Sequence, residues 1–272
     1  MELRLPLAQL GPRSGPEPRP ESASESGVDS LAVCLDEPEK TSDLAVLYLH
    51  GFGSSQAGEK ADLFRARFLA RGIAFCSFDF QGHGESDGWM FDLTLSRNVA
   101  DVELVHTELK RRGYQRVVLF GSSMGGLTGL WYAARHPQAV HAAIHLAPAL
   151  GLEETFSAEL GTDKVERWQR EGKLEIGHDL GAWDIGWNFV EDLRAHDVAT
   201  LCAHYRTPTL IFQGKHDTSV PWRQVVEFAA QSAGEEIELH LFADGDHRML
   251  DRLQRLWLLT EEFLVGRGLT PS

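Results

Sequence analysis

The chain has 272 residues, of which 43% are hydrophobic and 24% charged, and these proportions are typical of a globular protein with a buried core. Its 40 Asp and Glu residues exceed its 26 Lys and Arg residues, so the formal net charge is −14. Because phosphate groups and anionic membrane surfaces attract basic faces, this charge argues against a nucleic-acid partner and against membrane binding.

Residues 1–27 are rich in Pro, Gly, Ser and Glu, a composition that cannot bury enough apolar surface to offset the entropy lost on ordering. We expect a flexible N-terminal arm, or an irregular lead-in to an edge strand near residues 30–35. The segment lacks a cationic region followed by an apolar stretch, and it is too acidic for a transit peptide. No apolar run approaches membrane-spanning length, so we expect a cytoplasmic protein without membrane insertion.

From residue 44 onward, strand and helix patterns alternate. Residues 44–49 (LAVLYL) form a continuous apolar run, which is typical of a strand buried on both faces. The patterns that follow predict helix 59–71, strand 73–80, helix 95–112, strand 117–120, helix 127–134 and strand 142–147. This alternation predicts an α/β fold with a mostly parallel sheet and helices on both faces.

The alternation stops at residues 151–205, which carry short helical patterns and several aromatic residues but no good strand pattern. It resumes with strand 209–212, helix 222–230, strand 237–242 and helix 249–265. We therefore predict a core formed by residues 28–150 and 206–272, with residues 151–205 inserted as a small helical cap over the strand ends. The alternative is a plain surface insertion, although long insertions in compact domains are usually functional.

Residues 121–125 read GSSMG and match the pattern G-x-S-x-G, between a strand pattern and a helix pattern. This is the context of the sharp turn called a nucleophile elbow. Gly121, Gly125 and Gly126 suit such a turn because glycine has no Cβ to clash. We predict that Ser123 is a nucleophile; the alternative is a Gly/Ser-rich turn without chemistry.

A serine hydroxyl is a poor nucleophile unless a base takes its proton, and a third group must orient that base. Both partners are expected after later strands, in the chain order Ser, acid, His. Asp217 follows the strand pattern 209–212, and His247 follows the strand pattern 237–242. Both turns fall on the same edge of the sheet as Ser123, so we predict a Ser123, His247 and Asp217 triad.

Other candidates fit these roles less well. His216 shares its turn with Asp217 and is too close in sequence to be oriented by it. Asp244 and Asp246 flank His247 and are expected to shape its loop, while Ser122 is expected to point the other way on the elbow. The two further histidines in strand-end turns, His50 and His83, are expected to fix loops by hydrogen bonds rather than to act as a second base.

An oxyanion formed on attack needs two backbone N–H donors. We predict that Met124, which follows the nucleophile, and Phe52, in the glycine-rich turn after strand 44–49, supply them. Three aromatic residues of the insertion, Trp183, Trp187 and Phe189, are predicted to line an acyl pocket; the alternative is that they only pin the cap to the core.

The cysteines, Cys34, Cys76 and Cys202, are too few and too scattered for a disulfide framework or a zinc site. Residues 53–60 echo a phosphate loop, but Glu59 occupies the position of its lysine and no Ser or Thr follows Lys60. No His or Cys cluster has metal-ligand spacing. We therefore expect no cofactor and no metal.

With these residues assembled, the chain from about residue 44 to 266 resembles the α/β-hydrolase superfamily. Within it, residues 121–126, 217–222 and 246–249 resemble the branch of palmitoyl-protein thioesterases and acyl-glucuronide esterases. The resemblance implies a serine carboxylesterase or thioesterase that acts on a small acyl ester or thioester. Feruloyl and cinnamoyl esterases share the turn at residues 82–88 and are the close alternative. A non-catalytic ligand receptor and a peptidase remain open, as does a homodimeric assembly.

Overall fold

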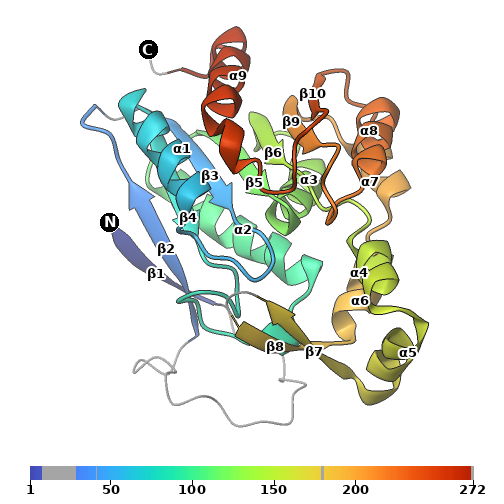
Figure 1. The fold of residues 1–272 in the computed structure, drawn as a ribbon. Helices are drawn as coiled ribbons and strands as arrows, with labels where there is room; N and C mark the ends of the chain where they lie inside the picture. The colour runs from blue at the N-terminus through green and yellow to red at the C-terminus, as the bar shows by residue number, and fades with distance from the viewer. Residues whose placement is uncertain (8–28, 41, 179–180, 271–272) are drawn as a thin grey trace.

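The computed structural model describes residues 1–7, 29–40, 42–178 and 181–270 (Figure 1). Eight strands form one sheet in the order β1-β2-β4-β3-β5-β6-β9-β10. They are β1 (Glu2–Pro6), β2 (Ser30–Asp36), β3 (Leu44–Leu49), β4 (Ala74–Phe78), β5 (Arg116–Ser122), β6 (Ala142–Leu146), β9 (Thr209–Gly214) and β10 (Ile237–Phe242). The pairs from β4 through β10 are all parallel, whereas β2 is antiparallel to both of its neighbours.

Helices cover both faces of this sheet. One apolar cluster joins α1 (Glu59–Ala70) and α9 (Leu253–Gly266) to the sheet, and a second joins α2 (Leu95–Arg111), α3 (Met124–Arg135) and α8 (Trp222–Gln231) to it. Side chains of β3 alternate between the two clusters, so a strand that is apolar throughout serves both faces. The predicted α/β architecture with a mostly parallel sheet is confirmed.

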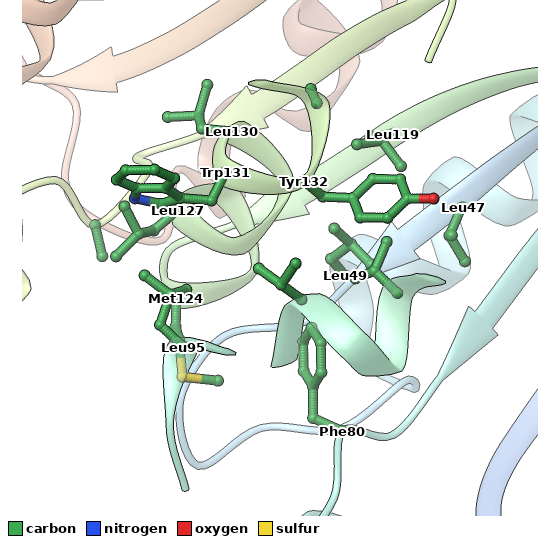
Figure 2. Packing of buried hydrophobic residues seen from close by; sticks show 14 of the residues in the cluster. Leu47, Leu49, Phe80, Leu95, Leu119, Met124, Leu127, Leu130, Trp131 and Tyr132 are labelled. Carbon is green, nitrogen blue, oxygen red and sulfur yellow. The ribbon is translucent and has the colours of Figure 1, made fainter. Parts of the chain in front are cut away.

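The core beneath α3 fixes the helix that follows the predicted nucleophile. Figure 2 shows labelled side chains of this helix packed with side chains of β3 and β5. The labelled members of this cluster that lie on α3 are Met124, Leu127, Leu130, Trp131 and Tyr132, and those from β3 and β5 are Leu47, Leu49 and Leu119. All of these side chains are buried, so the start of α3 is held against the sheet from within.

The segment 151–205 contains more than helices. Its elements are α4 (Leu152–Leu160), α5 (Thr162–Glu171), β7 (Lys173–His178), β8 (Gly181–Gly186), α6 (Asn188–Ala195) and α7 (Val198–His204). Strands β7 and β8 form an antiparallel pair of their own, so the expectation of a purely helical cap is wrong. The signal is weak but present, since Leu174 and Ile176, and Trp183 and Ile185, are apolar residues spaced by two. The division into core and cap stays a prediction.

The N-terminal segment also differs from its prediction. Residues Glu2–Pro6 form the edge strand β1, which pairs with β2 in antiparallel register from Glu2↔Cys34 to Pro6↔Ser30. Leu5 is only 9% exposed, because this strand turns one apolar side chain into the core. The flexible arm is therefore wrong for these residues, and its remainder at 8–28 lies outside the described residues.

Element ends differ from the prediction by a few residues. Strand 73–80 is observed as Ala74–Phe78, and the last helix begins at Leu253 after a 3-10 turn, η2 (Leu250–Arg252). A second such turn, η1 (Met90–Asp92), precedes α2. Among the helices described, none has the length and apolar character that crossing a membrane requires.

Candidate active site

Ser123 lies between β5 and α3 in a strained backbone conformation, with φ 53° and ψ −119°. A residue with a Cβ rarely adopts a positive φ, and such strain is stored mainly at functional sites. The flanking glycines make the turn sterically feasible. A Cβ at Gly121 would lie 2.6 Å from the carbonyl oxygen of Gly125, and a Cβ at Gly125 would collide with the carbonyl groups of Leu49 and His50.

The loop after β3 approaches the same serine. A Cβ added at Gly51 would lie 3.3 Å from the Cβ of Ser123 and 3.9 Å from its Oγ. The backbone of this loop therefore passes directly beside Ser123, and a Cβ at residue 51 would make a tight contact that requires Ser123 to shift slightly. Phe52 follows Gly51 in this loop, and Met124 is the first residue of α3. The first N–H groups of a helix have no acceptor within the helix, which suits Met124 to oxyanion binding.

Asp217 and His247 contact each other. His247 Nδ1 donates to Asp217 Oδ2 at 2.8 Å, although the two residues are 30 positions apart. Asp217 follows β9 and His247 follows β10, and these two strands are adjacent and parallel. Because β5 runs parallel in the same sheet, its end and Ser123 lie on this edge too. The sheet thus collects the three predicted residues at one edge, and the Asp–His pair is in hydrogen-bond contact.

Asp217 is held by four donors. Its Oδ1 accepts from the backbone N–H groups of Ser219 at 2.9 Å and Val220 at 2.8 Å, and its Oδ2 accepts from Gln213 Nε2 at 3.0 Å as well as from His247. Burial opposes ionisation of this carboxyl group, but the hydrogen bond and charge of His247, with those from Val220 and Gln213, outweigh it and lower the pKa of Asp217. Asp217 therefore remains an anion that fixes His247 Nδ1–H, which leaves Nε2 to act as a base. No feature of the sequence pattern identified Gln213.

The two other strand-end histidines, His50 and His83, lie edge-on to each other, and His50 fixes the loop after β3 by hydrogen bonds. His50 Nδ1 donates to Gly51 O at 2.8 Å, and its Nε2 accepts from the N–H of Phe80 at 3.0 Å. Burial lowers the pKa of His50 to about 4 and that of His83 to about 3, with the His50 ring adding to the effect at His83. Both rings are therefore neutral, as loop-fixing groups should be.

The other residues considered in the sequence analysis for roles at this site make different contacts. Ser122 Oγ accepts from Lys60 Nζ at 2.8 Å, and Asp246 Oδ1 accepts from the backbone N–H of Met249 at 2.6 Å, which shapes the loop that carries His247. Asp244 is exposed and bonded to Arg252, and His216 is also exposed. None of these residues replaces a member of the Ser123, Asp217 and His247 set, whereas Lys60 is a neighbour of the site that the sequence analysis did not identify.

The aromatic residues of the insertion fall into two groups. The Trp183 ring lies 6.3 Å from the Phe52 ring in an edge-on arrangement, beside the loop after β3. Trp187 is buried against Trp168, with ring centroids 5.6 Å apart, and Phe189 is 1% exposed and packs on Phe156. Burial of Trp187 and Phe189 in the core favours the packing alternative for these two. Phe156, whose ring is 5.7 Å from that of Phe52, also contacts the loop after β3.

A parallel sheet with helices on both faces, a serine in a strained strand-to-helix turn, and an acid–histidine pair after later strands define the α/β-hydrolase class. A family model described as "Serine aminopeptidase, S33" (Hydrolase_4) matches residues 40–179, which is just over half of the chain. The chain belongs to this family of α/β hydrolases.

Known proteins agree with this assignment. The mouse mitochondrial palmitoyl-protein thioesterase ABHD10 is 28% identical over 226 residues, which cover 82% of this chain and 75% of that protein. The solved structure of mouse α/β hydrolase domain-containing protein 10 superposes with a TM-score of 0.75 at 25% identity, covering 90% of this chain and 97% of that chain. The esterase Est1E of Butyrivibrio proteoclasticus, solved with ferulic acid bound, superposes with a TM-score of 0.78 at 23% identity, covering 89% and 97% of the two chains.

The last likeness shows the fold alone. The α/β-hydrolase fold and the predicted resemblance to this branch are confirmed. The mouse relative is named as mitochondrial, and the cytoplasmic location of this chain stays a prediction.

Proposed function

We propose that this protein is a serine hydrolase that cleaves ester or thioester bonds of small acyl substrates. The observation that carries the proposal is the 2.8 Å hydrogen bond from His247 Nδ1 to Asp217 Oδ2 at the sheet edge where Ser123 is held at φ 53°. A strained serine, a base and a buried anion that orients the base are the parts that acyl transfer requires. None of them alone would indicate this chemistry.

In the proposed first half-reaction, Ser123 Oγ attacks the acyl carbonyl carbon while His247 Nε2 takes its proton. Asp217 stabilises the imidazolium that forms, and the N–H groups of Phe52 and Met124 donate to the oxyanion. As the tetrahedral intermediate collapses, the bond to the leaving oxygen or sulfur breaks and His247 returns the proton to that atom. The products are a free alcohol or thiol and an acyl group esterified to Ser123.

In the second half-reaction, His247 takes a proton from water as the water oxygen attacks the acyl carbonyl. The same two N–H groups bind the second oxyanion, and the proton passes to Ser123 Oγ as the acyl–oxygen bond breaks. The carboxylic acid leaves and the free serine is restored. No metal or cofactor enters these steps, because the imidazole carries the proton in both directions.

The acyl pocket of this proposal centres on Trp183. Its ring lies beside Phe52, whose backbone is the proposed oxyanion donor, so the side chain is close to the position of the acyl carbonyl. Trp187 and Phe189 remain in the proposal as buried packing residues, Trp187 against Trp168 and Phe189 against Phe156. We expect Trp183→Ala to change the preferred acyl length and Trp187→Ala mainly to lower stability. Equal chain-length profiles for wild type and Trp183→Ala would contradict this pocket.

The thioester alternative rests on the relative named as a palmitoyl-protein thioesterase, and the aromatic ester alternative on the fold-level likeness to Est1E with ferulic acid. The experiment is hydrolysis of p-nitrophenyl esters from acetate to palmitate, acyl-coenzyme A thioesters, methyl ferulate and an aminoacyl p-nitroanilide, each with wild type and Ser123→Ala. We expect turnover of the acyl esters or thioesters that is lost in the variant.

Labelling by an alkyl fluorophosphonate adds a readout that does not depend on the substrate. We expect covalent labelling of wild type at Ser123 and none of Ser123→Ala, because only an activated serine reacts with this probe. Absence of both labelling and turnover would contradict the proposal and favour a non-catalytic receptor. Turnover of the p-nitroanilide alone would indicate a peptidase.

A further inference from the structure

A lysine side chain reaches the nucleophile elbow from outside the proposed triad. Lys60 is the second residue of α1, and its Nζ donates to Ser122 Oγ at 2.8 Å, across 62 positions of sequence. Ser122 is the last residue of β5 and directly precedes Ser123. The bond thus ties the first turn of one covering helix to the backbone that carries the proposed nucleophile.

The placement of this ammonium group is unfavourable for local structure. Lys60 lies at the N-terminal end of α1, where the helix dipole favours anions over cations. Burial, together with the charge of Arg248, lowers the pKa of Lys60 to about 8 against the opposing carboxylates of Asp246 and Asp217. A buried ammonium group at the N-terminal end of a helix indicates a function other than stabilising that helix.

The groups that act on Lys60 come from several elements that surround the site. Asp217 follows β9, while Asp246 and Arg248 flank His247 in the loop after β10, and Ser122 belongs to β5. Lys60 is therefore in electrostatic contact with the acid of the proposed triad and in hydrogen-bond contact with the neighbour of its nucleophile. While it is protonated, Lys60 supplies a positive charge that no other group in the mechanism above supplies before attack.

We propose that Lys60 is a positioning residue of this site: its ammonium group holds Ser122, and so the elbow backbone, and supplies a positive charge beside the Asp217–His247 pair. The inference rests on the proposed function. The ammonium group holds the elbow in position for attack, and its positive charge stabilises the oxyanion that forms on Ser123 attack. Both effects accelerate attack at Ser123 while Lys60 is protonated, and both weaken when it is neutral.

This assignment predicts the alkaline side of the pH profile. Since the pKa of Lys60 is about 8, its charge is present below that pH and is lost as the pH rises through it. Reactivity of Ser123 should therefore fall above about pH 8. The pKa of Asp217 is lowered, so its titration does not produce this fall.

The experiment is the second-order rate of Ser123 labelling by an alkyl fluorophosphonate between about pH 6 and pH 10, read by intact mass. Lys60→Met removes the charge and keeps the length of the side chain. We expect labelling at neutral pH to slow by about tenfold and the fall above about pH 8 to disappear. Lys110→Met, which removes an exposed lysine from α2, is the matched control and should keep the wild-type profile.

Lys60→Arg tests the charge itself. Arginine remains protonated far above pH 8, so we expect this variant to keep the neutral-pH rate within about threefold and to extend the plateau beyond about pH 9. Ser122→Ala removes the acceptor but leaves the ammonium, and it should retain the alkaline fall.

A wild-type profile in Lys60→Met would overturn the inference, and so would an unchanged alkaline fall in Lys60→Arg. If Lys60→Met does not fold, the Lys60→Arg profile decides alone. Failure of the wild type to be labelled at any pH would instead overturn the proposed function.

Discussion

Both carboxylate oxygens of Asp217 accept two hydrogen bonds each, so a substitution at this residue leaves donors without an acceptor. Two backbone N–H groups donate to Oδ1, and Gln213 and His247 donate to Oδ2. An asparagine in its place would turn its NH₂ group toward donors in either orientation of the amide. The four surrounding donors therefore require a carboxylate at this position, as does the proposed role of orienting His247.

From this we predict that Asp217→Asn lowers kcat on an active acyl ester by roughly 10³- to 10⁴-fold, because the imidazole loses the anion that fixes its tautomer. The thermal midpoint should fall as well, since buried donors lose their acceptor. Both quantities are measured on the same preparation, with Asp244→Asn as the control for an exposed aspartate nearby. A wild-type kcat in a folded Asp217→Asn would remove this residue from the site.

Single residues also show what sequence could and could not predict about the site. The candidates Ser123, Asp217 and His247 could be named from the sequence because each follows a strand whose end is visible in the apolar pattern. Lys60 was not, because its contact with Ser122 depends on how α1 packs against the sheet, and no spacing records that. Phe156 was missed for the same reason, since only the folded insertion brings its ring to Phe52.

At the scale of elements, the contact between the start of α3 and the end of β3 leaves no room for a side chain. A Cβ at Gly125 would meet the carbonyl groups of Leu49 and His50, which are backbone atoms that cannot rotate away. We predict that Gly125→Ala destabilises the protein by about 3 kcal/mol and moves Ser123 out of its productive position. Thermal denaturation and fluorophosphonate labelling measure the two effects.

Gly266→Ala is the matched control for this change. A Cβ at this exposed residue at the end of α9 has no neighbour within 4 Å, and alanine favours helix more than glycine does. Its stability should equal or slightly exceed that of wild type. If both variants behave alike, the elbow contact is not as tight as described.

Trp168 ties two elements of the insertion, α5 and β8, to each other. Trp168 of α5 donates from Nε1 to Ile185 O at 2.9 Å and packs edge-on against Trp187. We predict that Trp168→Phe lowers stability by about 1–2 kcal/mol, because the carbonyl of Ile185 loses a buried donor while most of the packing remains. Limited proteolysis should then cut within residues 151–205 faster than in wild type, whereas equal cutting rates would contradict this role.

The prediction of strands and helices succeeded where the sequence has a clear apolar pattern and failed where that pattern is weak. The continuous apolar run of β3 and the alternating pattern of β10 (IELHLF) predicted Leu44–Leu49 and Ile237–Phe242 with the observed ends. The β7–β8 pair and β1 were missed because each strand carries only two large apolar residues spaced by two, which is a weak pattern. In such segments, tertiary packing decides the structure more than local pattern does.

On the scale of the whole molecule, several buried histidines make stability depend on pH. Burial lowers the pKa values of His50 and His106 to about 4 and those of His83 and His145 to about 3. As pH falls below 6.5, the unfolded chain takes up protons at these histidines that the folded chain does not. Burial raises the pKa of Asp101 to about 7, so the folded chain holds one proton there that the unfolded chain lacks.

The sum is an uptake of about three protons on unfolding near pH 5, so stability should fall as the pH drops from about 6.5 to 5. Urea denaturation across this range measures the slope. His106→Gln should reduce it by about one proton, and His216→Gln, at an exposed residue, should leave it unchanged. A stability that is flat between these pH values would contradict the neutral state of the buried rings.

The segment 151–205 leaves the sheet after β6 and returns at β9, and these two strands are neighbours in the sheet. Ala143 N donates to Pro208 O at 2.9 Å, and Ala147 N donates to Phe212 O at 2.8 Å. The pairing of β6 with β9 therefore holds the two ends of this segment close together. The entropic cost of closing the loop between them grows only slowly with the length of the loop. An ancestral gene could lengthen, shorten or exchange this stretch by recombination without altering a residue of the acid–base pair. Descendants of one such gene would then diverge in the molecules they accept while inheriting the same reaction.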